Sequence, residues 1–178
     1  MRHVIKKEEV AAAWVSQDRD HARTPTGNFS FTGFDRLYSY STCIASRIET
    51  KKKQDVIFVT SYSYSVTTNA QLSILNDLLR RLNHTPIIWT PDSCPTTTSD
   101  LPGVWKDLVA QASELWTKAS RARQNKPHLL QQGNNSLTQA NKLVELFGAD
   151  VVKGVKADTI EQLQEELRIN EAILELAS

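Results

Sequence analysis

The stretch from Gly27 to Thr68 constrains the fold of this chain more than any other. It concentrates tyrosines and β-branched residues in three alternating runs, at residues 27–33, 37–47 and 56–68. Turn residues or charged residues separate these runs, which is a pattern typical of a strand meander. We therefore expect residues 27–68 to form the structural core of the N-terminal half.

The alternation within each run predicts which side chains share a face of the sheet. Phe29 and Phe31 alternate with two hydroxyl residues and are predicted to point inward. The run 37–47 is interpreted as one strand. One face of it is predicted to hold Leu37, Ser39, Ser41 and Cys43, and the other Tyr38, Tyr40, Thr42 and Ile44. After a charged turn at residues 49–55, the apolar run 56–59 is typical of a central strand. Residues 86–90 are a fourth candidate strand, with Pro86 at its first position.

Helical spacing of apolar residues predicts five helices. A short amphipathic helix is expected from Lys6 to Gln17, with Trp14 as its anchor, followed by a polar loop at 18–28. Capping patterns predict a leucine-rich helix from Thr68 to Leu82 and another that opens at Ser136. Longer periodic runs predict helices at 101–124 and from Asp158 to Leu176.

These patterns predict an α+β protein. We expect a mainly antiparallel sheet of three or four strands covered by helices, followed by a C-terminal helical portion. Residues 1–90 are predicted to form the α+β domain, residues 91–102 a Pro/Ser/Thr-rich linker, and residues 103–178 the helical portion. In the alternative, the helical portion packs with residues 1–90 as one unit.

Composition and chain ends indicate a cytosolic location. The 40% apolar and 23% charged residues are those of an ordinary globular protein. No apolar run approaches the ~20 residues that span a bilayer, and the N-terminal residues lack the apolar segment of a secretion signal. Cys43 and Cys94 have no metal-binding spacing and are expected to be free thiols. Whether these two cysteines approach each other is left open.

No catalytic, metal or cofactor motif stands out. His3, His21, His84 and His128 lie in separate segments, and none has a partner at a ligand spacing. The chain contains no nucleophile elbow, P-loop or dinucleotide fingerprint. We therefore predict no metal and no cofactor, and an enzyme of unknown class is the third hypothesis only.

Nucleic-acid binding is a stronger hypothesis. Tyrosines on adjoining strands form a candidate stacking platform, and nearby cations are candidates for phosphate contacts. The same tyrosines also suit a half-buried core, which is the competing interpretation. The predicted binding residues are Arg19, His21, Arg23, Arg36, Tyr38, Tyr40, Arg47, Lys51, Lys52, Lys53, Tyr62 and Tyr64.

Binding to another protein is the third class of function that we consider, and the distribution of charge indicates which part of the chain would bind an anionic partner. Residues 1–90 carry 12 Lys/Arg against 8 Asp/Glu, and residues 91–178 carry 9 against 12. A polyanion would therefore meet the first half. Tyrosine and arginine are also frequent at the energetic centres of protein interfaces.

The final helix offers a route to self-association. Ile160, Leu163, Leu167, Asn170 and Leu174 follow a three-four spacing with one polar member. Such an Asn fixes the register of some coiled coils, so residues 159–176 are a candidate homo-oligomer contact. The competing interpretation is a helix packed on its own domain.

Part of the chain resembles a family of small proteins encoded by bacteriophages and related mobile elements. The resemblance covers residues 8–75 and is carried by Trp14, the Gly-Asn-Phe-Ser-Phe-x-Gly run at 27–33, Leu-Tyr-Ser-Tyr at 37–40, Ile-Ala at 44–45 and Tyr-Ser-Val-Thr-Thr at 64–68. It implies a non-catalytic phage accessory protein in the host cytosol that inhibits or redirects a host component, including one of host defence. Single-stranded nucleic-acid binding through the tyrosine and arginine residues is the alternative.

Overall fold

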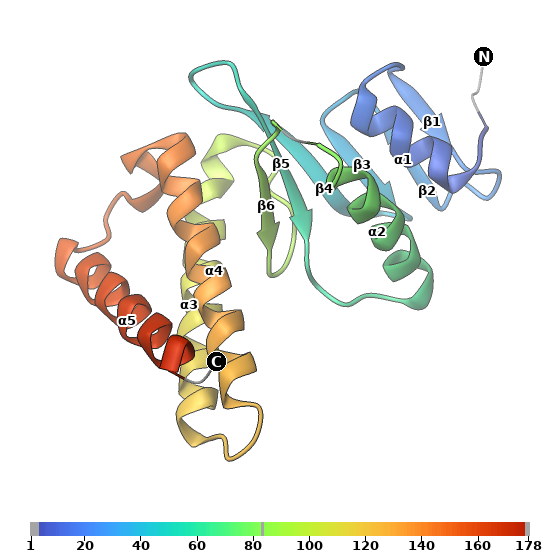
Figure 1. The fold of residues 1–178 in the computed structure, drawn as a ribbon. Coiled ribbons are helices and arrows are strands. Elements are labelled where there is room, and N and C mark those ends of the chain that lie inside the picture. Colours follow the sequence, from blue (N-terminus) through green and yellow to red (C-terminus); the bar gives the residue numbers. More distant parts are fainter. Residues whose placement is uncertain (1–3, 83, 177–178) are drawn as a thin grey trace. The chain divides into compact units, whose positions relative to one another are not determined.

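A computed structural model describes residues 4–82 and 84–176 (Figure 1). The chain divides into two compact units, unit 1 up to Thr98 and unit 2 from Ser99. Unit 1 contains a sheet and two helices, and unit 2 is helical. The α+β class and the C-terminal helical portion are therefore confirmed.

The sheet of unit 1 has six strands in sequential order. Strands β1 to β5 pair as antiparallel neighbours, and β5 pairs with β6 in parallel. The expectation of three or four strands is wrong. The strands are β1 (His21–Arg23), β2 (Phe29–Thr32), β3 (Arg36–Ser39), β4 (Thr42–Glu49), β5 (Asp55–Thr60) and β6 (Ile87–Thr90).

Two features of the sheet were missed by the periodicity. The stretch 18–28, predicted as a loop, contains the three-residue strand β1. The run 37–47 is two strands, because the chain turns at Tyr40 with a φ of 54°. The backbone N–H of Tyr40 donates to the carbonyl of Asn28 (2.9 Å). The predicted sharing of faces through 37–47 is therefore wrong beyond Ser39.

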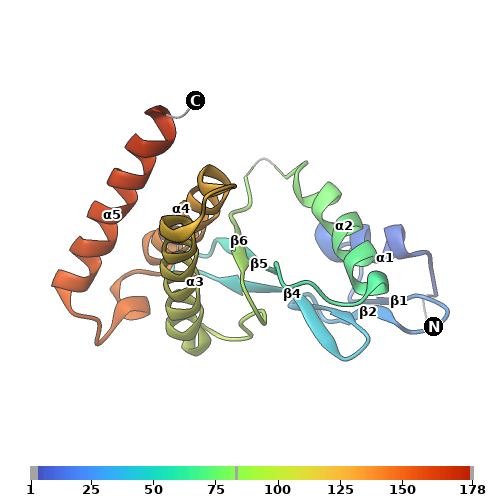
Figure 2. The same cartoon turned by 90° about the horizontal axis from the view of Figure 1, so that it is seen from below.

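Two helices cover one face of the sheet (Figure 2). They are α1 (Lys7–Ser16), which agrees with the predicted helix 6–17, and α2 (Val66–Leu79), which joins the parallel strands β5 and β6. The α2 helix begins earlier than predicted, because Ser65 Oγ accepts the backbone N–H of Thr68 (3.3 Å). The apolar core under both helices includes Trp14, Phe29, Phe31, Leu37, Ile57, Val59, Leu72 and Leu75.

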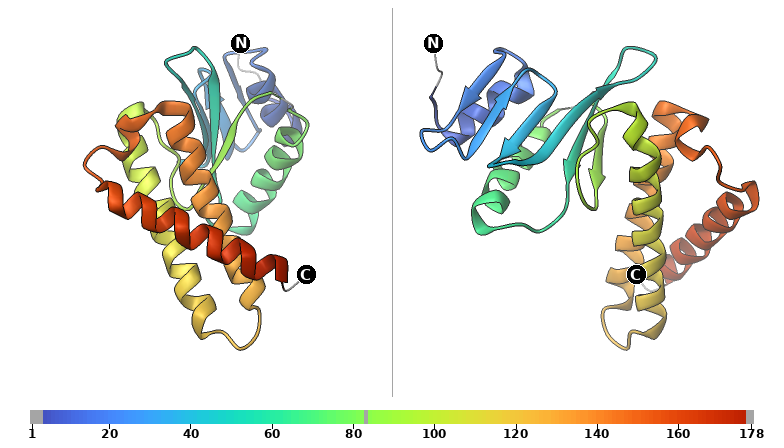
Figure 3. Two further views of the ribbon diagram at one scale, coloured as in Figure 1. Left: turned by 60° about the vertical axis from the view of Figure 1, so that its left-hand side comes forward. Right: turned by 180° about the vertical axis from the view of Figure 1, so that it is seen from behind.

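Unit 2 is built on a hairpin of two long helices, with a third helix crossing it (Figure 3). Its elements are α3 (Leu101–Arg121), α4 (Lys126–Phe147), the short 3-10 helix η2 (Ala149–Val152) and α5 (Ala157–Leu176); a further 3-10 turn, η1 (Thr98–Asp100), lies at the boundary of the units.

The prediction that a helix opens at Ser136 is wrong, because Ser136 lies in the middle of α4. The run Gly-Asn-Asn-Ser at 133–136 resembles a helix break in the sequence, yet it packs the hairpin. Gly133 lies against the ring of Trp116, and Trp116 Nε1 donates to Asn134 Oδ1 (2.9 Å).

The predicted seam of α5 faces its own unit. Leu163 and Asn170 are buried, and α5 is tied to α4 by a hydrogen bond from Gln164 Nε2 to Asn141 Oδ1 (2.8 Å). The seam therefore packs within the protomer, which was the competing interpretation of this pattern. A separate apolar edge of α5, at Ile169, Ile173 and Leu176, is exposed.

Within the described ranges, 4–82 and 84–176, no helix has the length and apolar character required to cross a bilayer.

Candidate binding surface

The face of the sheet opposite α1 and α2 carries a row of polar side chains across four strands. The strand register places Arg23 beside Ser30, Ser30 beside Tyr38, and Tyr38 beside Cys43. Alternation along a strand sends neighbouring residues to opposite faces, so the buried Ala22 faces the helices while Arg23 does not.

A second row lies next to the first. His21 pairs with Thr32 across β1 and β2, and Arg36 pairs with Ser46 across β3 and β4. We call the two rows without the buried Ser46 the polar strip; its members are His21, Arg23, Ser30, Thr32, Arg36, Tyr38 and Cys43. These side chains are half-buried or exposed. Figures 2 and 3 show that the two helices of unit 1 leave this face uncovered.

Two arginines give the polar strip its charge. Neither Arg23 nor Arg36 forms an ion pair with a carboxylate in the part of the chain that the structure describes. A hydrogen bond with Tyr38 is the main cause that raises the pKa of Arg36, which therefore stays cationic. His21 differs from the arginines, because its Nδ1 lies 2.7 Å from Asp20 Oδ1.

The rest of the predicted binding residues lie elsewhere. Arg19 pairs with Asp18 in the loop before β1, and Tyr40 is 58% exposed at the β3–β4 turn. The three lysines, Lys51, Lys52 and Lys53, are exposed at the tip of the β4–β5 hairpin.

Arg47 points to the helix-covered face and is not available for a phosphate contact. Its side chain is only 8% exposed, and its guanidinium lies over the ring of Trp14. The prediction that Arg47 is available as a binding residue is therefore not supported by its position. The register instead pairs Arg47 with the core residue Ile57.

The predicted tyrosine platform is divided between two places. Tyr38 belongs to the polar strip, whereas Tyr62 and Tyr64 lie in the connection between β5 and α2 and contact each other edge to face, with ring centroids 4.9 Å apart. The two pairs do not lie on adjoining strands, because Tyr40 is in the β3–β4 turn and Tyr62 and Tyr64 follow the end of β5.

Tyr62 borders an open hollow of about 490 Å³ at the ends of the parallel strands β5 and β6. Its wall includes Asn69 and Asn76 of α2 and Trp89 of β6. No sequence motif pointed to this hollow, because it arises from the β5–α2–β6 crossover.

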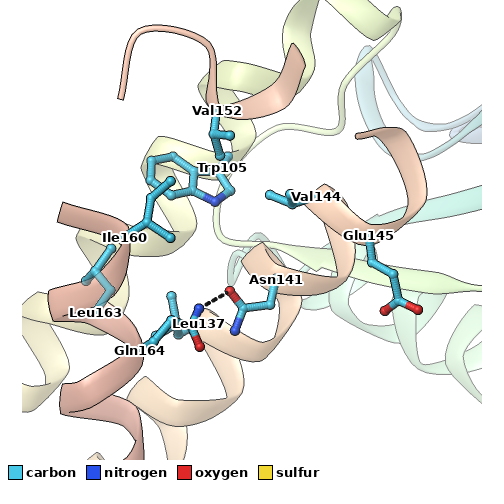
Figure 4. Close-up of a pocket in the computed structure, with 9 residues that line it drawn as sticks. All are labelled: Trp105, Leu137, Asn141, Val144, Glu145, Val152, Ile160, Leu163 and Gln164. Atoms are coloured by element: carbon cyan, nitrogen blue, oxygen red, sulfur yellow. Dashed lines mark hydrogen bonds between the residues drawn. The ribbon is translucent and has the colours of Figure 1, made fainter. Parts of the chain in front are cut away.

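A second cavity of about 450 Å³ lies within unit 2 (Figure 4). Trp105, Val144 and Ile160 contribute apolar wall, and the Asn141–Gln164 hydrogen bond closes one side. Glu145 is the one titratable side chain among the described lining residues. The cavity therefore lacks a pair of groups suited to acid-base catalysis.

His84 and His128 are exposed in different units, and His3 lies outside the described residues. His21 on β1 is three strands from Cys43 on β4, or about 14 Å at the usual strand spacing. Among the residues that the structure describes, no three potential metal ligands gather.

No protein-family model matches the chain, and comparisons with curated proteins and with solved structures find no match. The resemblance of residues 8–75 to bacteriophage proteins therefore stays a prediction.

Proposed function

We propose that this chain is a non-catalytic binding protein whose polar strip contacts an acidic surface of another protein. One observation carries the proposal: Arg23 and Arg36 lie on the sheet face opposite α1 and α2, without an ion-pair partner among the described residues. Uncompensated arginines on such a face favour an anionic partner, and arginine and tyrosine are preferred at interface centres.

The resemblance to bacteriophage proteins supports the choice of partner. It favours a host component met in the host cytosol, including a component of host defence, which the protein would inhibit or redirect. The lack of an acid-base pair among the described residues that line the unit 2 cavity supports a role by binding instead of catalysis.

Single-stranded nucleic acid is the second candidate, and the contact between Arg36 and Tyr38 favours it. An arginine beside an aromatic ring suits a phosphate next to a stacked base. The division of the tyrosines weighs against this candidate, because sequence-independent binding of single strands uses several aromatic rings along one groove.

Affinity capture from host lysate, with and without nuclease, tests the proposal. The bait is the full chain, and the comparison is Arg36→Glu, which reverses one strip charge. Arg81→Glu is the matched control, since Arg81 is exposed at the end of α2 in the same unit. We expect one stoichiometric, nuclease-resistant protein on the wild type and on Arg81→Glu.

Arg36→Glu should capture at least tenfold less of that protein than the wild type does, because reversal of the charge replaces attraction by repulsion. Equal capture by Arg36→Glu and wild type would contradict the proposal, because the contact would then lie outside the polar strip. Material released by nuclease would favour the nucleic-acid candidate in place of a protein partner.

A further inference from the structure

Cys43 and Cys94 are distant in sequence and adjacent in the fold. Cys43 lies on β4 at the end of the polar strip, beside Tyr38. Cys94 follows β6, in a segment that folds back over the same sheet face. Both residues belong to unit 1 and are free thiols in this structure.

Three hydrogen bonds hold the segment 92–95 on the sheet. Thr60 Oγ1 of β5 donates to the carbonyl of Asp92 (2.6 Å), and Ser46 Oγ of β4 donates to the carbonyl of Pro95 (2.5 Å). The Cys94 thiol donates to the carbonyl of Phe58 (3.7 Å). Ser46 and Phe58 are register partners on β4 and β5, so Cys94 is fixed over these two strands.

The two thiols interact directly and differ in access. Each thiol shifts the pKa of the other, and each also lies near a backbone carbonyl, Cys43 Sγ at 3.3 Å from that of Ala45 and Cys94 Sγ at 3.7 Å from that of Phe58. Cys43 is half-buried at the strip, whereas Cys94 is only 5% exposed. The Cys43 thiol is therefore accessible to a reagent in solvent, whereas the Cys94 thiol is accessible mainly to Cys43.

We propose that Cys43 and Cys94 form a redox-responsive pair that closes into an intramolecular disulfide in the presence of a low-molecular-weight disulfide oxidant. This inference concerns the thiols alone and does not depend on the partner of the polar strip.

The reaction proceeds by two thiol–disulfide exchanges. The Cys43 thiolate attacks one sulfur of the oxidant, for example glutathione disulfide; a mixed disulfide forms, and the first glutathione leaves as a thiolate. The Cys94 thiol loses its proton and attacks Cys43 Sγ, and the second glutathione leaves. The protein loses two protons and two electrons, and glutathione disulfide becomes two thiols.

The electrostatics of the pair support these roles. Hydrogen bonding to Cys94 lowers the pKa of the Cys43 thiol, desolvation opposes this change, and the positive charge of Arg36 adds to the lowering. Hydrogen bonding to Cys43, followed by burial, raises the pKa of Cys94 well above its ordinary value. The exposed thiol is thus also the one that forms the thiolate more readily.

A glutathione redox series on the full chain tests the proposal. Samples are quenched with acid, alkylated under denaturing conditions and weighed by mass spectrometry. We expect wild type to lose both alkylation sites together without retaining glutathione. Cys94→Ser should accumulate one glutathione on Cys43, and Cys43→Ser should keep Cys94 unmodified in the folded state.

The same series in denaturant shows whether the fold favours the bond. The folded chain should form the bond at a disulfide-to-thiol ratio at least tenfold less oxidising than the denatured chain requires. An equal ratio, or a wild type that retains glutathione without closing the bond, would overturn the proposal.

The pH dependence of alkylation checks which thiol attacks. A lowered pKa places the thiolate at lower pH, so iodoacetamide should modify wild-type Cys43 with a midpoint below that of an ordinary thiol, about 8.5. Arg36→Ala should move the midpoint up, and Arg81→Ala should not. A wild-type midpoint above that of an ordinary thiol would overturn the assignment of Cys43 as the attacking group.

Discussion

The guanidinium of Arg47 joins β4 to the end of α1. It donates to the carbonyls of Trp14 (3.2 Å) and Val15 (2.8 Å), which lie in the last turn of the helix. Its carbon Cζ lies 4.8 Å from the centre of the Trp14 ring, and Asp55 is 3.6 Å from its terminal nitrogen. A cation suits the C-terminal end of a helix, so this side chain acts as a structural clamp.

Replacing Arg47 by Ala should destabilise unit 1 by about 2–4 kcal/mol, because charge-assisted hydrogen bonds and a buried cation–ring contact are lost together. Amide hydrogen exchange of α1 measures the effect in the full chain, and Arg81→Ala controls for the loss of charge. We expect faster exchange across α1 in Arg47→Ala alone. Unchanged exchange would contradict the role of Arg47 as a clamp.

At the residue scale, alternation predicted part of the polar strip. Phe29 and Phe31 do face the core, as their spacing indicated. The same period-two pattern continues in His21-Ala22-Arg23, but three residues between charged and turn residues give too short a signal for a strand. Beyond Ser39 the pattern failed, because the chain turns at Tyr40, which pairs Ser39 with Thr42, and a register shift in the β3–β4 pair then interrupts the alternation again.

Close packing within the α3–α4 hairpin depends on one glycine. A Cβ at Gly133 would lie 2.6 Å from the ring of Trp116 and 3.2 Å from the carbonyl of Ala112. Next to it, the Asn134 side chain accepts the indole N–H, which satisfies a buried donor. The contact between the two helices therefore requires a residue without a side chain at position 133 and a hydrogen-bond acceptor at position 134.

Gly133→Ala should destabilise unit 2 by about 1–3 kcal/mol, because overpacking exceeds the gain in helix propensity of about 1 kcal/mol. Gly103→Ala is the matched control: it is also a helical glycine, and nothing lies within 4 Å of its added Cβ. Thermal unfolding by circular dichroism should show a lower midpoint for Gly133→Ala and an equal or higher one for Gly103→Ala. A higher midpoint for both would mean that Trp116 moves aside easily.

At the element scale, the periodicity of apolar residues predicted most helices, whereas the residue types in the turns did not predict where the chain turns. The apolar spacing located α1, α2, α3 and α5 within a few residues, because burial of one helix face dictates that spacing. The β3–β4 turn was missed, since Tyr40 and Ser41 are not typical of a turn with positive φ. The start of α4 was misplaced because polar residues that pack a helix hairpin resemble a helix break in the sequence.

The path of residues 92–95 over the sheet could not be predicted from the sequence. Its hydrogen bonds reach Ser46 and Thr60, residues far away along the chain, and no local pattern marks these contacts. The proximity of Cys43 and Cys94 follows from this path. Long-range pairing of this kind depends on the complete sheet, so composition and spacing could not reveal it.

The charge of the whole molecule is weak, which bears on how a partner would bind. The chain carries a net charge of +1, with 12 Lys/Arg against 9 Asp/Glu up to Thr98 and 9 against 11 from Ser99. A small net field gives little long-range steering, so the rate of association should lie in the ordinary range of about 10⁵–10⁶ M⁻¹ s⁻¹.

Salt dependence of binding distinguishes the polar strip from the lysine hairpin. If two strip arginines alone contact the phosphates of a single strand, the slope of log affinity against log salt is about −1.4, which is about a sevenfold loss between 50 and 200 mM salt. Adding three lysines from residues 51–53 would give a slope of about −3.5 and a loss above a hundredfold. If the nucleic-acid candidate is right, we expect the smaller loss, measured by fluorescence anisotropy with labelled oligothymidylate. Replacing all three lysines by Ala should leave it unchanged, whereas a steep dependence that those replacements abolish would place the contact on the hairpin.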